Sequence, residues 1–477
     1  MTEPKKPVRL LERLAFAKVE MWAVLLLALA GLVGVSLYGW LLRESLSDPN
    51  ASWASRAAVN LADLPAKAAT LWQHGLALDE QGRLVQSSPR VFDFEGDTGA
   101  GFQQVDPDFE EDGLLLISAY HPEHQTALVY LLDLESGERL WEWLPDHDQI
   151  VEMTPSLKRA REAGRVPIGT NRRIDFQCRH PYLLENGNIL SQGGINGVLF
   201  MMNPHGEILW TLDGQFHHTI ERQADGNFLV HRSVDRPGGI SGTVLEGLEV
   251  REDFYLVVSP DGEILDERSV LGILERGGYA GLYAGVGPWE SDVLHTNDAD
   301  PILADDPYVR KGDVMISCRN VSSVFLYRPS EDRIVWLQTG PWLNQHDIDY
   351  LGDGVFSIFD NHDVRRFGRP LLPPTTLRTF DAKTGKTTNP FGDIFRREKL
   401  HTLTEGLHRI LANGDAFVEI TNQNEILRLS PDQVRWRYVH RTGPGQIGAL
   451  HWARYFERDE LDLSWIGQQR IGHETNP

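Results

Sequence analysis

Two histidines occupy the same place in two copies of one sequence pattern. His218 lies eight residues before Gly226, and His346 lies eight residues before Gly354. In both copies a strand-like run leads into an Asp-Gly turn and a second strand-like run, which is a strong hairpin signal. Both imidazoles are therefore expected at the start of an inner strand.

A third histidine and an arginine stand in a neighbouring unit. His295 lies in the segment DVLHTNDADPI and Arg319 in DVMISCRNVSSVFLY. Together with the first two histidines they can converge from three successive units. Three histidines could bind zinc, but the fixed charge of Arg319 repels a divalent cation and suits a tetrahedral oxyanion such as sulfate or phosphate. Because a neutral imidazole can attack the central atom of such a group, the residues indicate transfer of an oxyanion.

Recurring hairpins must position these side chains. Six hairpin turns are centred on Gly137, Gly206, Gly262, Asp332, Gly385 and Asp432. In four of them a tryptophan follows the turn by four residues and offers apolar area to the next unit: Trp141, Trp210, Trp336 and Trp436. A second hairpin precedes the first in several units, and two hairpins make a four-stranded sheet. We therefore predict an all-β fold, a six-bladed β-propeller, with a pair of β-sandwiches as the alternative.

An apolar stretch precedes the repeats. Met21–Leu42 runs 22 residues without a charge, about 33 Å as a helix, which spans a bilayer. Basic residues are more frequent before the stretch than after it, so the N-terminus is expected in the cytoplasm. A cleaved signal peptide is the competing interpretation, although its apolar part would be shorter.

These patterns predict four parts of the chain. They are a cytoplasmic segment (1–20), a transmembrane anchor (21–42), a linker or helical, irregular arm (43–100) and the propeller (101–477). The protein is then a single-pass protein of the inner (cytoplasmic) membrane, with its catalytic domain on the periplasmic or extracytoplasmic side.

The composition excludes several functions. Asp and Glu number 68 against 46 Lys and Arg, a net charge of −22, so the surface repels nucleic acid. Cys178 and Cys318 are the only cysteines, which excludes a cysteine-rich zinc site and a disulfide scaffold. The acidic run Asp106–Asp112 is expected to be a solvated loop rather than a calcium site.

Several segments resemble the bacterial arylsulfate sulfotransferases. They are FHHTIERQADGNFLV, DVLHTND, SCRNVSSVFLY, NQHDIDYLGDGVFSIFDN and HWARYF. Members of that family are periplasmic six-bladed propellers that move a sulfuryl group from a phenolic sulfate ester to a phenol without a nucleotide donor. The resemblance implies an aryl sulfate donor, a hydroxyl acceptor, a ping-pong mechanism through a sulfohistidine, and neither a cofactor nor a metal.

The resemblance also assigns roles to residues. His346 would take the sulfuryl group covalently, Arg319 would hold its oxygens, and His295 and His218 would bind oxygens and transfer protons. Four further residues are expected to contact substrate: His217, Asn297, Asn361 and Trp342. An Asx turn is a competing explanation for the asparagine at 361, and core packing for the tryptophan.

Two other functions stay open at this point. One is a non-enzymatic envelope propeller that binds a protein or a polysaccharide. The other is an oxidoreductase or hydrolase with a bound quinone or metal. Propellers carry many unrelated functions, so the fold alone does not decide between them. A homo-oligomer is also compatible with the sequence.

Overall fold

The computed structural model describes residues 20–47, 52–62, 64, 76–78, 84–86, 90–93, 101–163, 176–194, 197–284, 291–362 and 375–467. The chain divides into two compact units: Met1–Ser87 with Gly287–Trp289, and Ser88–Val286 with Glu290–Pro477. The expected cytoplasmic segment lies outside the described residues except for its last residue, Glu20.

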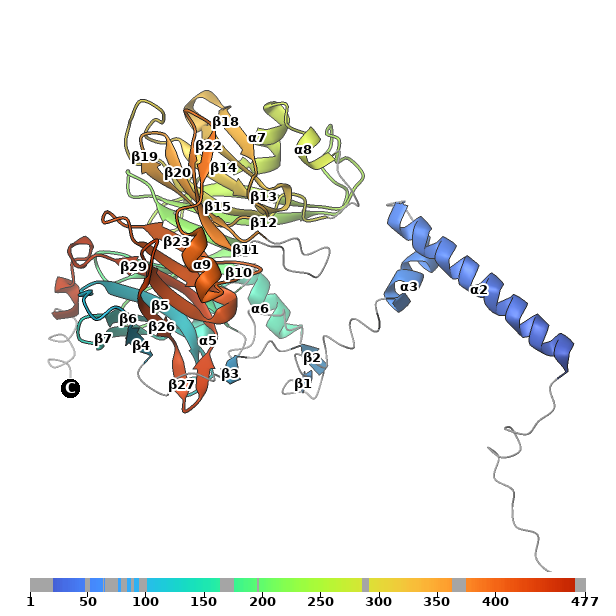
Figure 1. Cartoon of the computed structure of the whole chain (residues 1–477), viewed down its shortest axis with the longest axis horizontal. Coiled ribbons are helices and arrows are strands. Elements are labelled where there is room, and N and C mark those ends of the chain that lie inside the picture. The colour runs from blue at the N-terminus through green and yellow to red at the C-terminus, as the bar shows by residue number, and fades with distance from the viewer. Residues whose placement is uncertain are drawn as a thin grey trace, which may run out of the picture. The chain divides into compact units, whose positions relative to one another are not determined.

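The first unit contains a long apolar helix, α2 (Met21–Ser47), and a short one, α3 (Trp53–Ala62); both are visible in Figure 1. By length and composition α2 is able to cross a membrane. Two contacts hold α3 to α2: Tyr38 Oη donates to the Ala58 carbonyl at 3.0 Å, and Ser55 Oγ donates to Glu44 Oε2 at 2.6 Å. A small hairpin, β1 (Leu76–Leu78) with β2 (Leu84–Gln86), completes the described part of this unit.

The second unit is mostly antiparallel β-sheet. Three sheets have the order β15–β16–β17–β18, β19–β20–β21–β22 and β23–β24–β25–β26–β4. Their strands are β15 (Thr296–Pro301), β16 (Val314–Cys318), β17 (Ser323–Arg328), β18 (Arg333–Thr339), β19 (Ile348–Gly352), β20 (Val355–Asp360), β21 (Thr376–Asp381), β22 (Lys386–Thr388), β23 (Leu407–Ile410), β24 (Ala416–Ile420), β25 (Glu425–Leu429), β26 (Val434–Val439) and β4 (Phe102–Gln104).

A seven-stranded sheet consists of two such meanders that share one long strand. Its strands are β8 (Cys178–Leu183), β9 (Ile189–Gly193), β10 (Gly197–Met202), β11 (Ile208–Arg222), β12 (Phe228–Arg236), β13 (Val250–Val258) and β14 (Ile264–Ser269). The first part of β11 pairs with β10 and the last part pairs with β12, with a register shift between His217 and Ile220. The shared strand thus passes from one meander to the next at the predicted site histidines.

The remaining elements lie at the ends of the chain and in the loops. A four-stranded sheet joins β29 (Leu450–Phe456) to β5 (Leu114–His121), β6 (Thr126–Asp133) and β7 (Arg139–Trp143), and a small sheet joins β27 (Arg441–Gly443), β28 (Gln446–Gly448) and β3 (Val91–Asp93). The helices are α5 (His147–Met153), α6 (Pro155–Glu162), α7 (Val270–Arg276), α8 (Gly281–Ala284) and α9 (Gly392–Glu398). Part of the expected linker is therefore sheet, because Val91–Asp93 pairs with β28.

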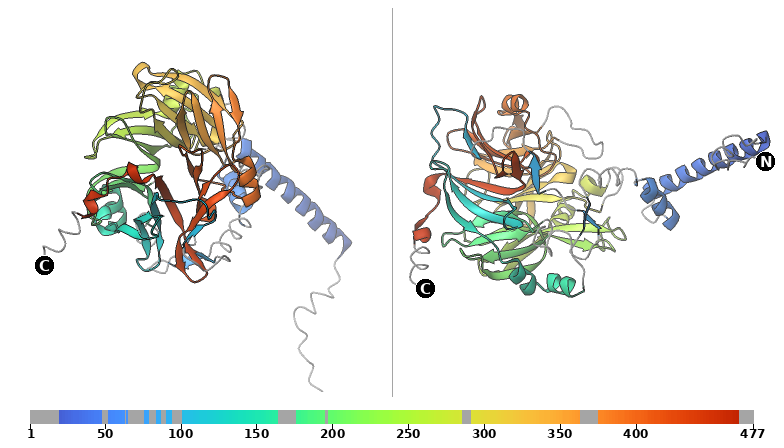
Figure 2. Two further views of the ribbon diagram at one scale, coloured as in Figure 1. Left: turned by 60° about the vertical axis from the view of Figure 1, so that its left-hand side comes forward. Right: turned by 90° about the horizontal axis from the view of Figure 1, so that it is seen from below.

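The predicted turns join strands as expected, and their tryptophans contact the following meander. Trp141 Nε1 donates to the Pro204 carbonyl at 2.9 Å, and Trp210 Nε1 donates to the Pro260 carbonyl at 3.0 Å. The Trp336 ring lies 5.0 Å from the ring of Phe356. Three meanders are thereby packed on the following one, and in the left view of Figure 2 the sheets follow one another around a centre in chain order.

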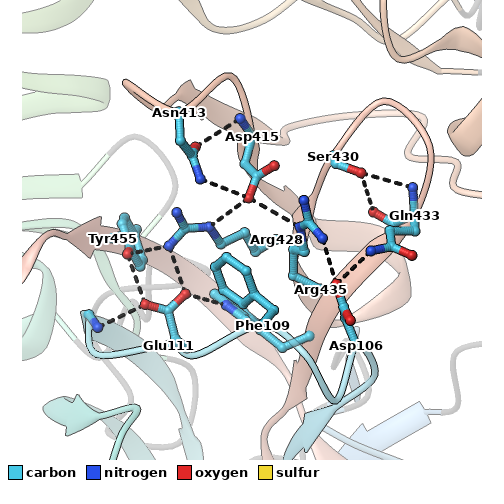
Figure 3. Close-up of polar contacts among 12 residues, drawn as sticks. Asp106, Phe109, Glu111, Asn413, Asp415, Arg428, Ser430, Gln433, Arg435 and Tyr455 are labelled. Atoms are coloured by element: carbon cyan, nitrogen blue, oxygen red, sulfur yellow. Dashed lines mark hydrogen bonds and ion pairs between the residues drawn. The ribbon is translucent and has the colours of Figure 1, made fainter.

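The end of the chain closes this arrangement on its beginning. β29 pairs antiparallel with β5, so the last described strand lies in one sheet with β5, β6 and β7 from the early part of the unit. Beside it, Arg428 Nη1 donates to Glu111 Oε2 at 2.8 Å and to Tyr455 Oη at 2.6 Å, and Trp436 Nε1 donates to the same Glu111 oxygen at 2.6 Å. Figure 3 shows this network.

The acidic run at the start of the second unit differs from the expected solvated loop. The Glu111 side chain is buried against Arg428, and Asp106 Oδ2 accepts from Arg435 Nη1 at 2.5 Å. A buried carboxylate needs such partners because desolvation of an unpaired charge is costly. Asp106 and Glu111 therefore form internal ion pairs, whereas the other acids of the run, Asp108, Glu110 and Asp112, are exposed as expected.

Substitution of a turn glycine tests the packing of one meander on the next. Gly206 has φ +83°, and an added Cβ would lie 2.0 Å from the Leu144 carbonyl oxygen, whereas Gly137 has φ +72° and no atom within 4 Å of the same position. Gly137→Ala should cost only the left-handed backbone penalty, about 1 kcal/mol. Gly206→Ala should cost about 3 kcal/mol or more, because backbone must also move. Urea unfolding of the two variants measures the difference, and equal losses would contradict the close approach.

Candidate active site

The structure brings the three predicted histidines together. His218 lies in β11, His295 immediately precedes β15, and His346 precedes β19. The ring centroid of His218 is 5.3 Å from that of His295 and 6.0 Å from that of His346. His218 and His295 have φ values of +57° and +50°. This left-handed conformation is costly for a residue with a side chain.

Two independent contacts define the tautomer of His346. Asn361 Nδ2 donates to the carbonyls of Thr402 at 3.1 Å and Glu405 at 2.8 Å, so its Oδ1 faces His346 Nδ1 at 2.7 Å. An acceptor at that distance requires a proton on Nδ1. The backbone N–H of Glu405 donates to His346 Nε2 at 3.0 Å, which requires a lone pair there. His346 is therefore a neutral imidazole with its proton on Nδ1.

His295 is held by a carboxylate. Its Nδ1 lies 2.6 Å from Asp292 Oδ2, so Nδ1 carries a proton and Nε2 is on the opposite side of the ring. The next segment fixes both residues: Asn320 Nδ2 donates to the Asp292 carbonyl at 2.6 Å, and Arg319 N donates to the His295 carbonyl at 3.2 Å. The buried Arg319 belongs to a short 3₁₀ turn, η2 (Arg319–Val321), directly after β16.

His218 ends a chain of polar contacts that starts at a buried carboxylate. Ser233 Oγ donates to Asp253 Oδ1 at 2.9 Å, and His217 Nε2 lies 2.6 Å from Ser233 Oγ. His217 Nδ1 and His218 Nδ1 are 2.8 Å apart. Since the Ser233 proton is given to Asp253, His217 donates from Nε2 to Ser233 and accepts at Nδ1 from His218. His218 Nε2 then has a lone pair.

The three imidazoles share one hydrogen-bonding pattern. Each ring is tied through Nδ1, to Asn361, Asp292 or His217. The opposite nitrogen, Nε2, carries the lone pair of each ring, and in His346 this lone pair accepts from the Glu405 backbone N–H. Three unprotonated ring nitrogens that belong to one cluster can serve as a nucleophile and as proton acceptors.

Burial favours the neutral form of His218 and His295. Burial, and then the neighbouring histidines, hold the pKa of His218 well below its usual value. Burial also lowers the pKa of His295; the Asp292 carboxylate opposes this shift and the charge of Arg319 adds to it. Both rings are therefore neutral at pH 7, while Arg319 supplies a positive charge next to them.

The residues expected to contact substrate have different positions. His217 and Asn361 lie behind the reactive rings and orient them. Asn297 Nδ2 donates to the Gln345 carbonyl at 2.7 Å and so fixes the segment that leads to His346. Trp342 is fully buried in a hydrophobic cluster, with its ring 5.8 Å from that of Phe380. The structure thus places this tryptophan in the core and not beside the histidines.

Several functional contacts have no clear sequence signal. Asp292 could have been found from its place three residues before His295. Asp253, on β13, and Glu405, just before β23, contact the site from positions distant in the sequence, and no local pattern reveals them. Asp298, which follows His295 by three residues, accepts from Thr219 Oγ1 and from Ile348 N and serves the inter-sheet contact.

One group within the described residues has the spacing of metal ligands: Asp347, Asp349 and His408. His408 Nδ1 lies 2.7 Å from Asp347 Oδ2, and His408 Nε2 lies 2.7 Å from Ser357 Oγ. Each of the two ring nitrogens, either of which could bind a metal, is thus within hydrogen-bond distance of another group. Both cysteines are free and buried, and burial raises the pKa of each thiol.

The second unit thus consists of antiparallel sheets in a propeller-like arrangement that bring three histidines and a buried arginine together. The chain belongs to the arylsulfotransferase family: the family model described as Arylsulfotransferase (ASST) matches residues 180–441. These residues include every side chain that the sequence assigned to the site. No curated protein matches the chain significantly.

Solved structures with a similar arrangement have low sequence identity. Virginiamycin B lyase from Staphylococcus aureus is 11% identical, with 74% of this chain and 89% of that chain covered and a TM-score of 0.36. A streptogramin B lyase is 10% identical, with 72% and 88% covered and a TM-score of 0.35. A protein of unknown function from Bacteroides caccae is 13% identical, with 58% and 94% covered and a TM-score of 0.26.

The buried histidines predict a loss of stability in acid. Burial lowers the pKa of His231, which pairs with His217 across β11 and β12, to about 3. An unfolded histidine binds a proton below about pH 6.5 and the folded one does not, so the free energy of unfolding falls as the pH drops below that value. His231→Gln should remove roughly 2 kcal/mol of the loss between pH 6.5 and 5. Urea midpoints measure this; His205→Gln, at an exposed position, should behave as wild type. Equal pH slopes for wild type and His231→Gln would contradict the shift.

Proposed function

We propose that this protein is a membrane-anchored sulfotransferase with a six-bladed propeller. It moves a sulfuryl group from an aryl sulfate ester to a phenolic or other hydroxyl acceptor, through a sulfohistidine at His346 and without a nucleotide sulfate donor. The observation that carries this proposal is the hydrogen-bonding pattern that the three imidazoles share. Each is tied through Nδ1 to its own partner, and the three rings form one cluster, in which Arg319 lies near His295.

In the first half-reaction the Nε2 lone pair of His346 attacks the sulfur. A nitrogen–sulfur bond forms, and the bond between sulfur and the aryl oxygen breaks. The phenolate leaves with that electron pair and takes a proton from solvent. The Asn361 contact at Nδ1 stabilises the positive charge that develops on the ring, and Arg319 stabilises the sulfuryl oxygens.

In the second half-reaction a hydroxyl oxygen of the acceptor attacks the same sulfur. The nitrogen–sulfur bond breaks, and its electron pair returns to His346 Nε2. The hydroxyl proton goes to a neutral imidazole, His218 or His295, and then to solvent. The lowered pKa values of both rings keep them ready to accept this proton at pH 7.

The apolar helix α2 supports a location at the membrane. Its length and composition fit one crossing, and the bias of basic residues toward the N-terminal side favours the positive-inside orientation. The catalytic domain would then face the periplasm or another extracytoplasmic space, at the inner membrane. A signal sequence passes the same length and composition test.

A covalent adduct tests the proposed function. The full-length protein is incubated with a chromogenic phenyl sulfate and quenched, and its mass and peptides are analysed together with phenol release. We expect a gain of one sulfuryl group on the peptide that contains His346, and a complete loss of adduct and of transfer in His346→Gln.

His362→Gln is the matched control. His362 is a half-buried histidine on the following loop, where its Nδ1 lies 3.3 Å from Asp360 Oδ2. This variant should form the adduct as wild type does. An adduct that persists in His346→Gln would move the nucleophile to another residue. The absence of both adduct and phenol release in wild type would favour a binding propeller.

A further inference from the structure

Glu405 blocks the nitrogen that the proposed reaction needs. A neutral imidazole has one lone pair in the ring plane, and in His346 this lone pair accepts the Glu405 N–H at 3.0 Å. An attack on sulfur requires that same lone pair to point at the sulfur atom. In this structure the Nε2 lone pair of His346 is therefore occupied by a hydrogen bond and is not available for attack.

The backbone around Glu405 is fixed on both sides. Asn422 Oδ1 accepts from Leu403 N at 2.8 Å and from Thr404 N at 3.2 Å. On the other side, Gly406 N donates to Thr421 Oγ1 at 3.1 Å. Glu405 itself lies between these anchors with φ +61°, a conformation that a residue with a side chain adopts only under constraint.

The Glu405 carbonyl accepts from Asn361 Nδ2 at 2.8 Å, and the Glu405 side chain adds a further constraint. Its carboxylate pairs with Arg179 Nη1, which belongs to β8 in another sheet. Both side chains are largely buried, with exposures of 12% for Arg179 and 19% for Glu405, so solvent screens the pair only partly. Arg179 Nε also donates to Gln177 Oε1 at 2.8 Å, which fixes the guanidinium.

Two further groups lie near this ion pair. Glu419 is fully buried near the pair; burial, together with the charge of Glu405, raises the pKa of Glu419 to about 8. On the other side, His180, next to Arg179, has its ring 6.2 Å from that of His218. Arg179 is thus joined to the histidine cluster through Glu405, whose backbone N–H contacts His346.

We propose that Glu405 is a cap on His346, that Arg179 is the residue which holds the cap, and that the anionic group of the sulfuryl donor displaces the Glu405 carboxylate from Arg179. An entering oxyanion repels the carboxylate and offers the guanidinium an equivalent pair of oxygens. Release of the side chain lets the strained backbone relax and frees the Nε2 lone pair. The displacement step rests on the proposed function, whereas the cap rests on the geometry alone.

Carbethoxylation by diethyl pyrocarbonate tests the cap without any sulfuryl transfer. This small uncharged reagent acylates an unprotonated ring nitrogen, so its rate at His346 reports how available the lone pair is. The full-length protein is treated at pH 7, and the modified His346 peptide is followed by mass spectrometry, with exposed His205 as the internal reference.

Glu405→Gln and Arg179→Gln should each raise the rate at His346 on the order of tenfold, which corresponds to the loss of about 1.4 kcal/mol of cap stability. Arg179→Lys should fall between them and wild type, because it keeps the charge and loses the fork geometry. Glu460→Gln, which removes an exposed ion pair with Arg409, should leave the rate unchanged. The two primary variants lie in different sheets, so a folding defect in one leaves the other as a test.

The outcomes separate the two proposals. Unchanged or lower rates at His346 in both primary variants would overturn the cap. A raised rate together with no sulfuryl adduct in wild type would support the cap and overturn the sulfotransferase. If wild type forms the adduct, displacement by the donor predicts that Arg179→Gln raises KM for phenyl sulfate more than it lowers kcat; an unchanged KM would overturn the displacement step.

Discussion

The pairing of β29 with β5 is the constraint on which the site depends. The three imidazoles come from separate sheets, and each sheet has its position only because its neighbours are held in turn. Trp141, Trp210 and Trp336 pack their meanders on the following ones. In an open row, however, the first and last sheets would have no contact with each other. The chain therefore returns to its start, and the buried Arg428 and Glu111 fasten the junction.

Much of the fold was readable from the sequence, because a turn glycine has a local cause. Gly206 and Gly262 have φ values of +83° and +86° at the predicted hairpins, and only a residue without a Cβ adopts such values freely. His218 and His346 each lie eight residues before a turn glycine, and this equal spacing predicted that their rings lie close together. The sixfold count of blades and the location at a membrane remain proposals.

The rest was not readable because it depends on long-range contacts. Arg179 and Glu405 are separated by 226 residues, and nothing near either residue indicates the pair. Trp342 follows an exposed-looking Gly-Pro turn, yet its ring completes a core cluster with Phe380. Glu111 resembles the other acids of its run and is buried only because Arg428 reaches it. Burial of a charged group is decided by the partner, and the partner is not local.

The left-handed backbone at His180, His218 and His295 has a consequence for how such a site can change. Glycine would relieve the backbone at each of these positions, so the backbone contribution to stability favours loss of the imidazole. Backbone stability and retention of the imidazole are in opposition there. Selection for thermal stability alone would favour replacement of these histidines by glycine. An asparagine, which tolerates this conformation, would keep the backbone conformation and remove only the imidazole ring.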